Sequence, residues 1–544
     1  MLHTRTLPFL KSLSAPYSIA QRGTLLTTAL LLSACGGGGG GGGGAVVNTS
    51  PTGTWTPGVY AASSTFAARC ASPRSGIDAI TGVAYADKSG SSVDEKNWLR
   101  SWTHELYLWY REVPDTDPRS GVSVLDYFDA LKTSQTTASG SPKDQFHFTY
   151  TTAEWEQLSL NNSQSGYGAQ WALLASRPPR QLLVAYTEPN TPATTANLVR
   201  GTEVLIADGV DVVNANDQAS VDALNAAVFP SAPGQTHTFT VRNYGSTTTR
   251  NVTLTSATIT SVPVQNVHTI NTTTGVVGYM LFNDHLASAE QQLITAFTTL
   301  ANAGVTDLVL DIRYNGGGYL DIASELAYMV AGPAATANKT FEALQFNDQH
   351  PSTNPVTGGP LTPTPFHTTA QGFSASAGQP LPTLNLTRVF VLTGNGTCSA
   401  SEAIINGLRG VNVDVIQVGS VSCGKPYGFY ATENCGTTYF SIQFKGVNAK
   451  GFGDYSDGFA PNNSSNAFAT KIPGCSVGDD FGHALGNSAE SRLSAALNYR
   501  LTQTCPGATG VAGQTLLRQA VNRIPESDTV MTPKSPWLEN RIFR

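Results

Sequence analysis

The sequence predicts an α/β protein whose largest part, residues 261–505, is a mixed sheet with flanking helices. A small β-rich domain (166–260) and a helical region (76–165) precede it. Apolar residues spaced three and four apart near residue 100 indicate the buried stripe of a helix. Short apolar runs divided by turn residues indicate the β-rich domain, and strand-like runs alternating with helical ones indicate the α/β part.

The first 35 residues have the pattern of an export signal. A basic stretch ends at Arg22, and the apolar run TLLTTALLLSA leads to Cys35. The run is too short to span a bilayer but suits the core of a signal peptide. Leu32–Cys35 resembles a bacterial lipobox, which implies a lipid anchor at Cys35 in the cell envelope, and Gly36 resembles the outer-membrane pattern. An ordinary secretory signal is the alternative.

Composition narrows the classes of function. Residues 36–75 begin with nine glycines, which behave as a flexible coil, and are expected to be a tether. The net charge of −6 gives no basic footprint, so a nucleic-acid partner is not expected. An even number of cysteines in an exported chain predicts disulfides, with the pairing left open. These cysteines are Cys70, Cys398, Cys423, Cys435, Cys475 and Cys505.

The region 76–165 is expected to hold three helices. The first, over 94–113, carries an apolar stripe, and the others cover 124–133 and 152–160. The stripe consists of Trp98, Leu99, Trp102, Leu106 and Trp109.

The β-rich domain carries a first resemblance. Strands are expected at 180–188, 201–209 and 237–245, with a helix at 220–229. The segment Pro189–Val212 resembles the core of a PDZ domain, and GYGAQ (166–170) resembles the loop that receives a peptide's C-terminal carboxylate. Glycines let backbone amides face an anion while the peptide adds as an edge strand. The predicted peptide-binding residues are therefore Gly166, Tyr167 and Gly168.

In the α/β part, helical runs separate four strand-like runs. The strands are expected at 275–283, 306–315, 388–394 and 413–420, and helices at 289–304 and 320–332. This order predicts parallel pairing, with a site at the strands' carboxyl ends. An insertion at 332–385 shows little periodicity, and 506–544 form a tail with one expected helix.

Three segments at strand ends carry candidate chemistry. In DIRYNGGG (311–318), consecutive glycines expose amides that suit an oxyanion hole. In GTCSASE (396–402), Ser399 would sit where a helix start favours negative charge. In SCGKPYG (422–428), desolvation would let Lys425 act as a base. The structural alternative is a capping box formed by Ser399 and Glu402.

The order D-x-R-x-N-G-G-G, S-A-S-E and G-K resembles that of the C-terminal processing peptidases, or tail-specific proteases. In that family the first serine of S-A-S-E is the nucleophile and the later lysine is the general base, which implies these roles for Ser399 and Lys425. The PDZ-like module, DGFAPN (457–462) and residues 479–501 extend the resemblance over about 165–500.

The resemblance implies a crotonase-like α/β core and a serine endopeptidase that cleaves exported polypeptides near their C-termini through an acyl-enzyme. Amides near Gly317 and at Ala400 would hold the oxyanion, whereas Ser401 and Glu402 are expected to be structural. The reaction is expected to need no metal and no other cofactor.

Two positions depart from the family pattern. Phe429 stands where members often have glutamine, and Gly410 where some have an acid, so the lysine must be oriented in another way. Cys398 and Cys423 lie beside the two catalytic positions, and a disulfide between them would join the two loops. A bond between Cys423 and Cys435 is an equal alternative.

Three other functions stay open. A histidine, His285 or His483, would replace the lysine as base in a Ser-His-acid triad. An inactive surface lipoprotein would bind protein C-termini through its PDZ-like domain. A glycan-binding or adhesive lipoprotein is suggested by the Thr/Asn-rich composition alone.

Overall fold

The computed structural model describes residues 55–161 and 163–506. The predicted signal with Cys35, residues 36–54 of the predicted tether and residues 507–544 of the predicted tail lie outside the described residues.

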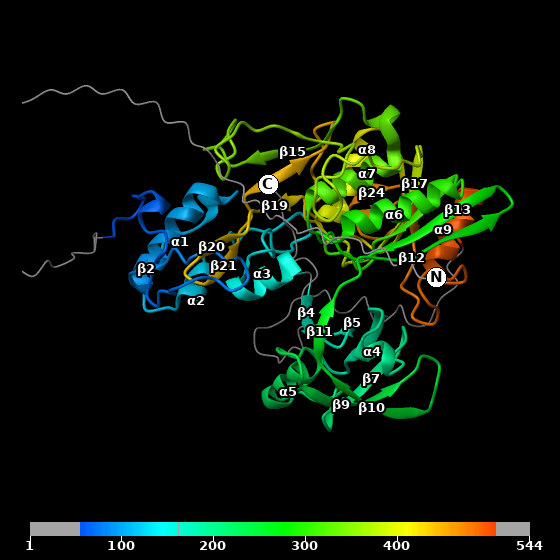
Figure 1. Cartoon of the computed structure of the whole chain (residues 1–544), viewed down its shortest axis with the longest axis horizontal. Helices are drawn as coiled ribbons and strands as arrows, with labels where there is room; N and C mark the ends of the chain where they lie inside the picture. The colour runs from blue at the N-terminus through cyan, green and yellow to red at the C-terminus, as the bar shows by residue number, and fades with distance from the viewer. Residues whose placement is uncertain (1–54, 162, 507–544) are drawn as a thin grey trace, which may run out of the picture. The chain divides into compact units, whose positions relative to one another are not determined.

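The largest sheet has six strands in the order β12-β13-β14-β17-β18-β25 (Figure 1). Strands β12 and β13 pair antiparallel, and all later neighbours pair parallel. This arrangement confirms the predicted α/β core with a mixed sheet. The strands are β12 (Val264–Thr272), β13 (Gly275–Phe282), β14 (Asp307–Asp311), β17 (Arg388–Thr393), β18 (Asp414–Gly419) and β25 (Gly474–Ser476).

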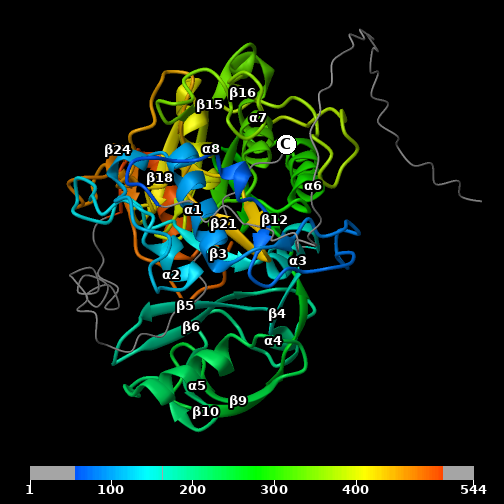
Figure 2. The ribbon, with the colours of Figure 1, turned by 90° about the vertical axis from the view of Figure 1, so that its left-hand side faces the viewer.

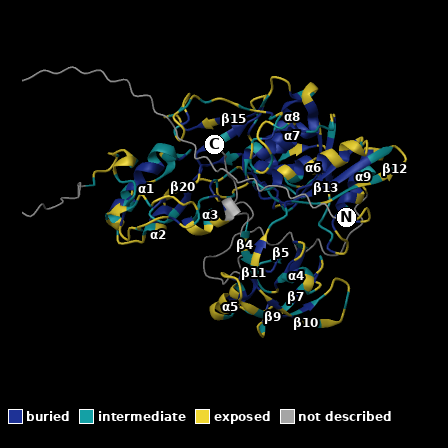
Figure 3. Cartoon of the chain, in the orientation of Figure 1, coloured by how far each residue is buried: buried dark blue, intermediate teal, exposed yellow. Residues whose placement is uncertain are grey.

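Helices cover both faces of this sheet. Successive strand residues point to opposite faces, so Met280 packs toward α6, α7 and α8, whereas Tyr279 packs toward α9. Burial on both faces explains why the parallel strands read as continuous apolar runs (Figure 3). The helices are α6 (Ala289–Asn302), α7 (Leu320–Thr336), α8 (Ala400–Gly410) and α9 (Ser491–Thr502).

The insertion contains a strand that the sequence did not indicate. Strand β15 (Thr340–Phe346) lies in a four-stranded sheet of order β16-β15-β22-β19. The other members are β16 (Thr364–Pro365), β22 (Phe444–Val447) and β19 (Tyr427–Gly428). Because β19 begins two residues after Lys425, this sheet holds the far side of the lysine loop.

The N-terminal region was expected to be helical, but it also contains strands. Helices α1 (Ser92–Leu106), α2 (Val124–Asp129) and α3 (Thr152–Asn161) form, but α1 ends before Trp109, which leaves that ring outside the helix. Strand β3 (Phe148–Thr151) pairs antiparallel with β21 (Thr437–Phe440), which also pairs with β20 (Thr432–Asn434). Shorter elements are η1 (Ser63–Thr65), β1 (Arg69–Cys70), β2 (Lys88–Ser89) and η2 (Tyr110–Glu112).

The β-rich module forms a sheet of order β10-β9-β7-β6-β5, with β8 paired to β7 (Figure 2). Its core joins strand residues such as Val184 and Phe239 to Leu224 of α5. A second pair, β4 with β11, closes the module. The elements are β4 (Ser163–Gly166), β5 (Ala169–Ala175), β6 (Gln181–Thr187), α4 (Pro192–Thr195), β7 (Glu203–Ala207), β8 (Val210–Asp211), α5 (Gln218–Val228), β9 (Thr236–Arg242), β10 (Thr249–Thr255) and β11 (Ala257–Thr260).

A short parallel pair, β23 (Phe459–Pro461) and β24 (Thr470–Ile472), completes the described elements. Within residues 55–161 and 163–506, no helix combines the length and apolar character needed to cross a membrane.

Candidate active site

Ser399 sits at the turn between β17 and α8, in a strained backbone conformation. Its φ of 58° and ψ of −114° lie outside the regions that residues with a Cβ normally occupy. Its side chain is buried, and its Oγ has no hydrogen-bond partner among the described residues. Such strain at a strand–turn–helix corner is common at functional sites, where it holds a side chain in an exposed or reactive direction.

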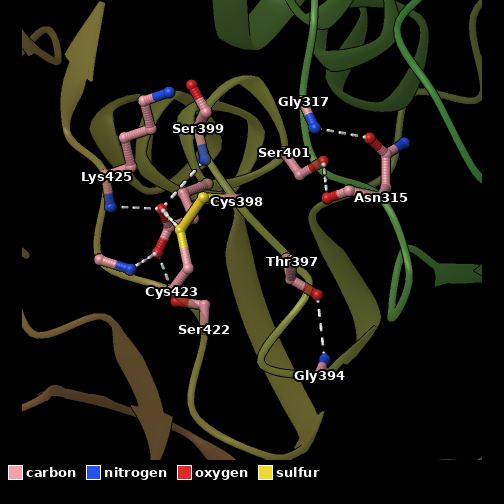
Figure 4. Close-up of a disulfide and its surroundings, with 12 residues drawn as sticks. Asn315, Gly317, Gly394, Thr397, Cys398, Ser399, Ser401, Ser422, Cys423 and Lys425 are labelled. Atoms are coloured by element: carbon pink, nitrogen blue, oxygen red, sulfur yellow. Dashed lines mark hydrogen bonds between the residues drawn. A yellow bond between two sulfur atoms is a disulfide. The ribbon is translucent and has the colours of Figure 1, made fainter. Parts of the chain in front are cut away.

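Lys425 lies on the facing loop and is almost fully buried, with 1% of its surface exposed. Burial lowers the pKa of Lys425 to about 7, although Asp144 and Glu402 favour its charged form. Figure 4 shows the end of the Lys425 side chain pointing toward the same space as the Ser399 hydroxyl. Both residues line one small cavity. The structure therefore brings the two predicted catalytic residues together.

Glu402 ties the serine helix to the lysine loop. Its buried carboxylate accepts hydrogen bonds from Ser422 Oγ (2.5 Å), Gly424 N (2.9 Å), Lys425 N (2.8 Å) and Ser399 N (3.1 Å). The last of these is the reciprocal bond expected of a capping box. Burial raises the pKa of Glu402, although the hydrogen bonds from these four donors act to lower it. Glu402 thus has the expected structural role, but it serves the lysine loop as well as the helix start.

A disulfide joins Cys398 to Cys423, with a Cα–Cα distance of 5.2 Å (Figure 4). Of the two bonds that the sequence left open for Cys423, the structure has the one to Cys398, which joins the two loops covalently, and not the one to Cys435. The remaining pairs are Cys70–Cys435 and Cys475–Cys505. Among the described residues, Cys398, Glu402 and Cys423 lie close together and are residue types that can bind a metal. The two cysteines form the disulfide, however, so neither has a thiolate to offer.

The triple-glycine loop packs directly against Ser399. Gly317 has a φ of +104°, and a Cβ there would lie 2.9 Å from Ser399 Cβ and 3.0 Å from Ala400 N. Only glycine allows this approach. The N–H of Gly317 donates to Asn315 Oδ1 (3.0 Å), while Ala400 provides the first amide of α8. The oxyanion roles of Gly317 and Ala400 stay predictions.

Asn315 joins the loops that the sequence treated separately. Its carbonyl accepts from Cys398 N (3.1 Å) and from Ser401 Oγ (3.1 Å). Ser401 is therefore held as a structural hydroxyl, as expected, and it fixes the first turn of α8 against the glycine loop (Figure 4).

The two candidate histidines lie in other settings. His285 is buried behind the glycine loop, where Nδ1 bonds Asn315 Oδ1 (3.0 Å) and burial lowers its pKa to about 3. His483 lies on the segment before α9, where Nδ1 bonds Asp480 Oδ2 (2.8 Å). Neither histidine lines the cavity shared by Ser399 and Lys425.

Glu342 is a residue of this cavity that sequence reasoning missed. It lies on β15, inside the insertion, and burial raises its pKa to about 8. Leu320, Ala403, Pro426, Tyr427 and Tyr455 complete the lining. No local pattern identified Glu342, because β15 reaches the site only through its pairing with β22.

A larger cavity of about 520 Å³ lies at the β-rich module. Its walls include all three predicted peptide-binding residues, Gly166, Tyr167 and Gly168, and extend to Gly316 of the glycine loop. Asn283, also on the wall, is buried, and neither its side-chain nitrogen nor its oxygen has a partner among the described residues. The cavity therefore offers an unsatisfied amide group to a ligand.

A buried ionic cluster joins the module to the glycine loop. Arg200 of the module donates to Asp479 Oδ1 (2.6 Å) and to the hydroxyl of Tyr314 (2.7 Å). Asp479 also accepts from Arg313 (2.7 Å), which is bound in turn by Glu490 (2.8 Å). Only Asn315 separates Arg313 and Tyr314 from the triple-glycine motif.

Two segments of the chain match models of known protein families. Residues 273–428 match the model of "Peptidase family S41", and residues 94–150 match that of the "Peptidase S41 N-terminal domain". A carboxyl-terminal-processing protease from Picosynechococcus sp. (strain ATCC 27264 / PCC 7002 / PR-6) is 30% identical over 173 residues, or 31% of this chain. The match spans 39% of that relative's length.

A crystal structure of a Bacteroides fragilis NCTC 9343 protein assigned to the S41 proteases shares the fold. Its TM-score is 0.55 at 23% identity, and the match covers 75% of this chain and 97% of that chain. The family resemblance predicted from the sequence is confirmed by these matches.

Proposed function

Because this chain contains the domains of peptidase family S41, we propose that it is a serine endopeptidase that uses Ser399 as nucleophile and Lys425 as general base. The observation that carries the proposal is the pairing of a strained, unpartnered serine hydroxyl with a buried lysine in one cavity. A lysine whose pKa is near 7 is about half neutral at pH 7, and the neutral form can accept a proton.

In the proposed reaction, neutral Lys425 takes the proton of Ser399 Oγ as Oγ attacks a peptide carbonyl carbon. The carbonyl oxygen becomes an oxyanion near the amide of Ala400, and the amide of Gly317 would have to leave Asn315 Oδ1 to share in holding it. When the C–N bond breaks, the lysine ammonium returns its proton to the leaving amine and an acyl-enzyme remains. Water then attacks the ester with the same lysine as base, and Ser399 regains its proton.

We propose that polypeptide substrates reach this site from the large cavity. Gly166, Tyr167 and Gly168 would receive a chain terminus in the manner of a PDZ domain, and Asn283 would pair with the peptide backbone. The continuity of the cavity walls from Gly168 to Gly316 supports this route. Cleavage near the substrate's C-terminus follows from it.

We also propose that the protein is held at the bacterial outer membrane through a lipid on Cys35. The lipobox-like Leu32–Cys35 supports this location, and six cysteines paired in three disulfides suit an oxidising compartment.

The test compares the purified full chain with Ser399→Ala and Lys425→Ala on an unfolded protein that ends in apolar residues. We expect cleavage by the parent and a cleavage rate lower by roughly 1,000-fold or more in each variant, because removal of either residue of a catalytic unit disables the same chemical step. Activity that survives Lys425→Ala but not Ser399→Ala would contradict the lysine base. A parent that binds C-terminal peptides without cutting any substrate would favour the inactive binding lipoprotein.

A further inference from the structure

The Lys425 ammonium lies between two aromatic rings from distant parts of the chain. Nζ is 4.5 Å from the ring centroid of Phe429 and 4.8 Å from that of Phe146. Phe429 is on the lysine's own loop, whereas Phe146 belongs to the N-terminal region. Both rings are buried in one cluster with the Cys398–Cys423 disulfide.

We propose that Phe146 and Phe429 are positioning residues for the general base, and that their ring faces hold the Lys425 amino group toward Ser399. This inference rests on the proposed function. An aromatic face carries partial negative charge, so it attracts an ammonium within about 6 Å without accepting its proton. Rings therefore orient the lysine yet leave its nitrogen chemically available once it is neutral.

The arrangement accounts for the unusual residue at position 429. A lysine side chain is long and flexible, and its ammonium is strongly hydrated. Burial removes much of this hydration, and the two ring faces offset part of the loss in fixed directions. Other polar groups near it include Asp144 and Glu402, together with Ser399, Glu342, Tyr427 and Tyr455 of the cavity wall.

The N-terminal region holds Phe146 in place through its own buried contacts. The N–H of Phe146 donates to Asp144 Oδ1 (2.9 Å), and the hydroxyl of Tyr107 donates to Asp144 Oδ2 (2.6 Å). The backbone of Leu108 then donates to Ile442 of the α/β part (2.8 Å). This region is therefore a wall of the active site, and its removal would expose the lysine to water.

The test uses Phe146→Leu and Phe429→Leu, alone and together. Leucine keeps the cavity apolar but has no ring face, so the charged lysine loses stabilisation while burial persists. We expect the pKa of Lys425 to fall by roughly half a unit to one unit per ring. The acylation rate at high pH should fall roughly tenfold or more, because the base is no longer held in line.

The matched control is Phe148→Leu. The ring of Phe148 stacks on Phe440 at 4.4 Å and makes an edge contact with Phe429. Phe148→Leu should therefore lose a similar amount of packing close to the lysine without removing a ring that contacts Nζ. Two readouts are measured in each variant. The first is the lysine pKa by NMR of ¹³C-labelled lysine in a Ser399→Ala background, with the signal assigned by Lys425→Arg. The second is the pH midpoint of labelling by a serine-directed fluorophosphonate.

A lower lysine pKa in the two ring variants, with no change in Phe148→Leu, supports the proposal. An unchanged or raised pKa in both ring variants overturns it, since the rings would then only exclude water. Phe429→Leu alone suffices if Phe146→Leu does not fold. If the NMR shift occurs but the parent reacts with no probe or substrate, the ring contact stands and the proposed peptidase function fails.

Discussion

At the scale of single residues, each of the two proposed catalytic residues lowers the stability of the fold. Ser399 occupies a backbone region that typically costs about 1–3 kcal/mol. Lys425 is buried, and burial lowers its pKa to about 7, so roughly half of it is uncharged at neutral pH. Both costs are tolerated because helix α8, the disulfide and Glu402 fix the surrounding loops.

This cost gives a first prediction, on pH. The pKa of Lys425 is about 7 in the fold and near 10.4 when unfolded, so the unfolded chain binds the extra proton between these values. The contribution of Lys425 to the free energy of unfolding is therefore lowest below pH 7 and rises toward pH 10. Lys425→Met should therefore raise the free energy of unfolding by about 4 kcal/mol at pH 6, and by much less at pH 10.

The measurement is thermal unfolding at both pH values, with Lys445→Met, a partly exposed lysine, as the control. A gain that does not shrink at pH 10 would contradict the assignment. In the parent, the same pKa predicts acylation that rises through about pH 7, because only the neutral amine accepts the serine proton.

At the scale of elements, the site depends on loops at the ends of β14, β17 and β18. The strands fix where these loops start, but the cross-links decide how they face one another. Glu402, in the first turn of α8 after β17, accepts three hydrogen bonds from the loop after β18, and Cys398–Cys423 links the two loops covalently. The backbone carbonyl of Asn315 joins the loop after β14 to this arrangement by accepting a hydrogen bond from Ser401.

The disulfides provide the second prediction, with a matched pair. Cys398–Cys423 closes a sequence separation of 25 and Cys475–Cys505 one of 30, so each should stabilise the fold by about 3 kcal/mol in the chain-entropy view. Replacing either pair with alanines should lower the melting temperature similarly. Only the Cys398→Ala/Cys423→Ala double variant should also lower the acylation rate.

Both rates and melting curves are measured on the two double variants. Equal loss of acylation in both would show that the active-site disulfide has no special positioning effect. Equal stability but unequal rates is the expected result, because Cys475 and Cys505 pack with α9, on the face of the sheet opposite α8.

At the scale of the whole molecule, a buried ionic cluster connects the β-rich module with the glycine loop. Burial opposes the charge on Asp479, but Arg492, Arg313 and Arg200 outweigh it and hold the pKa of Asp479 far below its usual range. Asp479 also accepts from Tyr314 Oη (2.5 Å). Removing the Asp479 carboxylate from this cluster leaves the buried arginine charge less well compensated.

The third prediction follows from this cluster. Asp479→Asn should destabilise the protein by about 3–5 kcal/mol, because Arg200 and Arg313 lose their shared partner. Asp454→Asn is the control, since that carboxylate is 85% exposed and its ion pair with Lys445 should contribute less than about 1 kcal/mol. The measurement is denaturant unfolding of the full chain. A change in Asp479→Asn no larger than in the control would contradict the structural role of the cluster.

Much of the fold was predictable because its signals are local. The apolar runs of β13, β14, β17 and β18, and the helical periods of α6, α8 and α9, lie within short windows. Strand β15 was missed because its partner β22 comes much later in the chain, and Trp109 was placed in a helix that ends at Leu106. The pairing of β3 with β21 likewise has no local signature.

The sequence by itself determined the order of the motifs, and with it the candidate pair Ser399 and Lys425 at successive strand ends. Each motif is written in adjacent residues, so it needs no knowledge of distant contacts. Only the tertiary structure decided that Cys398 pairs with Cys423, that Glu342 lines the cavity and that Phe146 lies over the lysine. These facts depend on packing between segments far apart in the chain, and packing is fixed by the whole fold rather than by any one stretch.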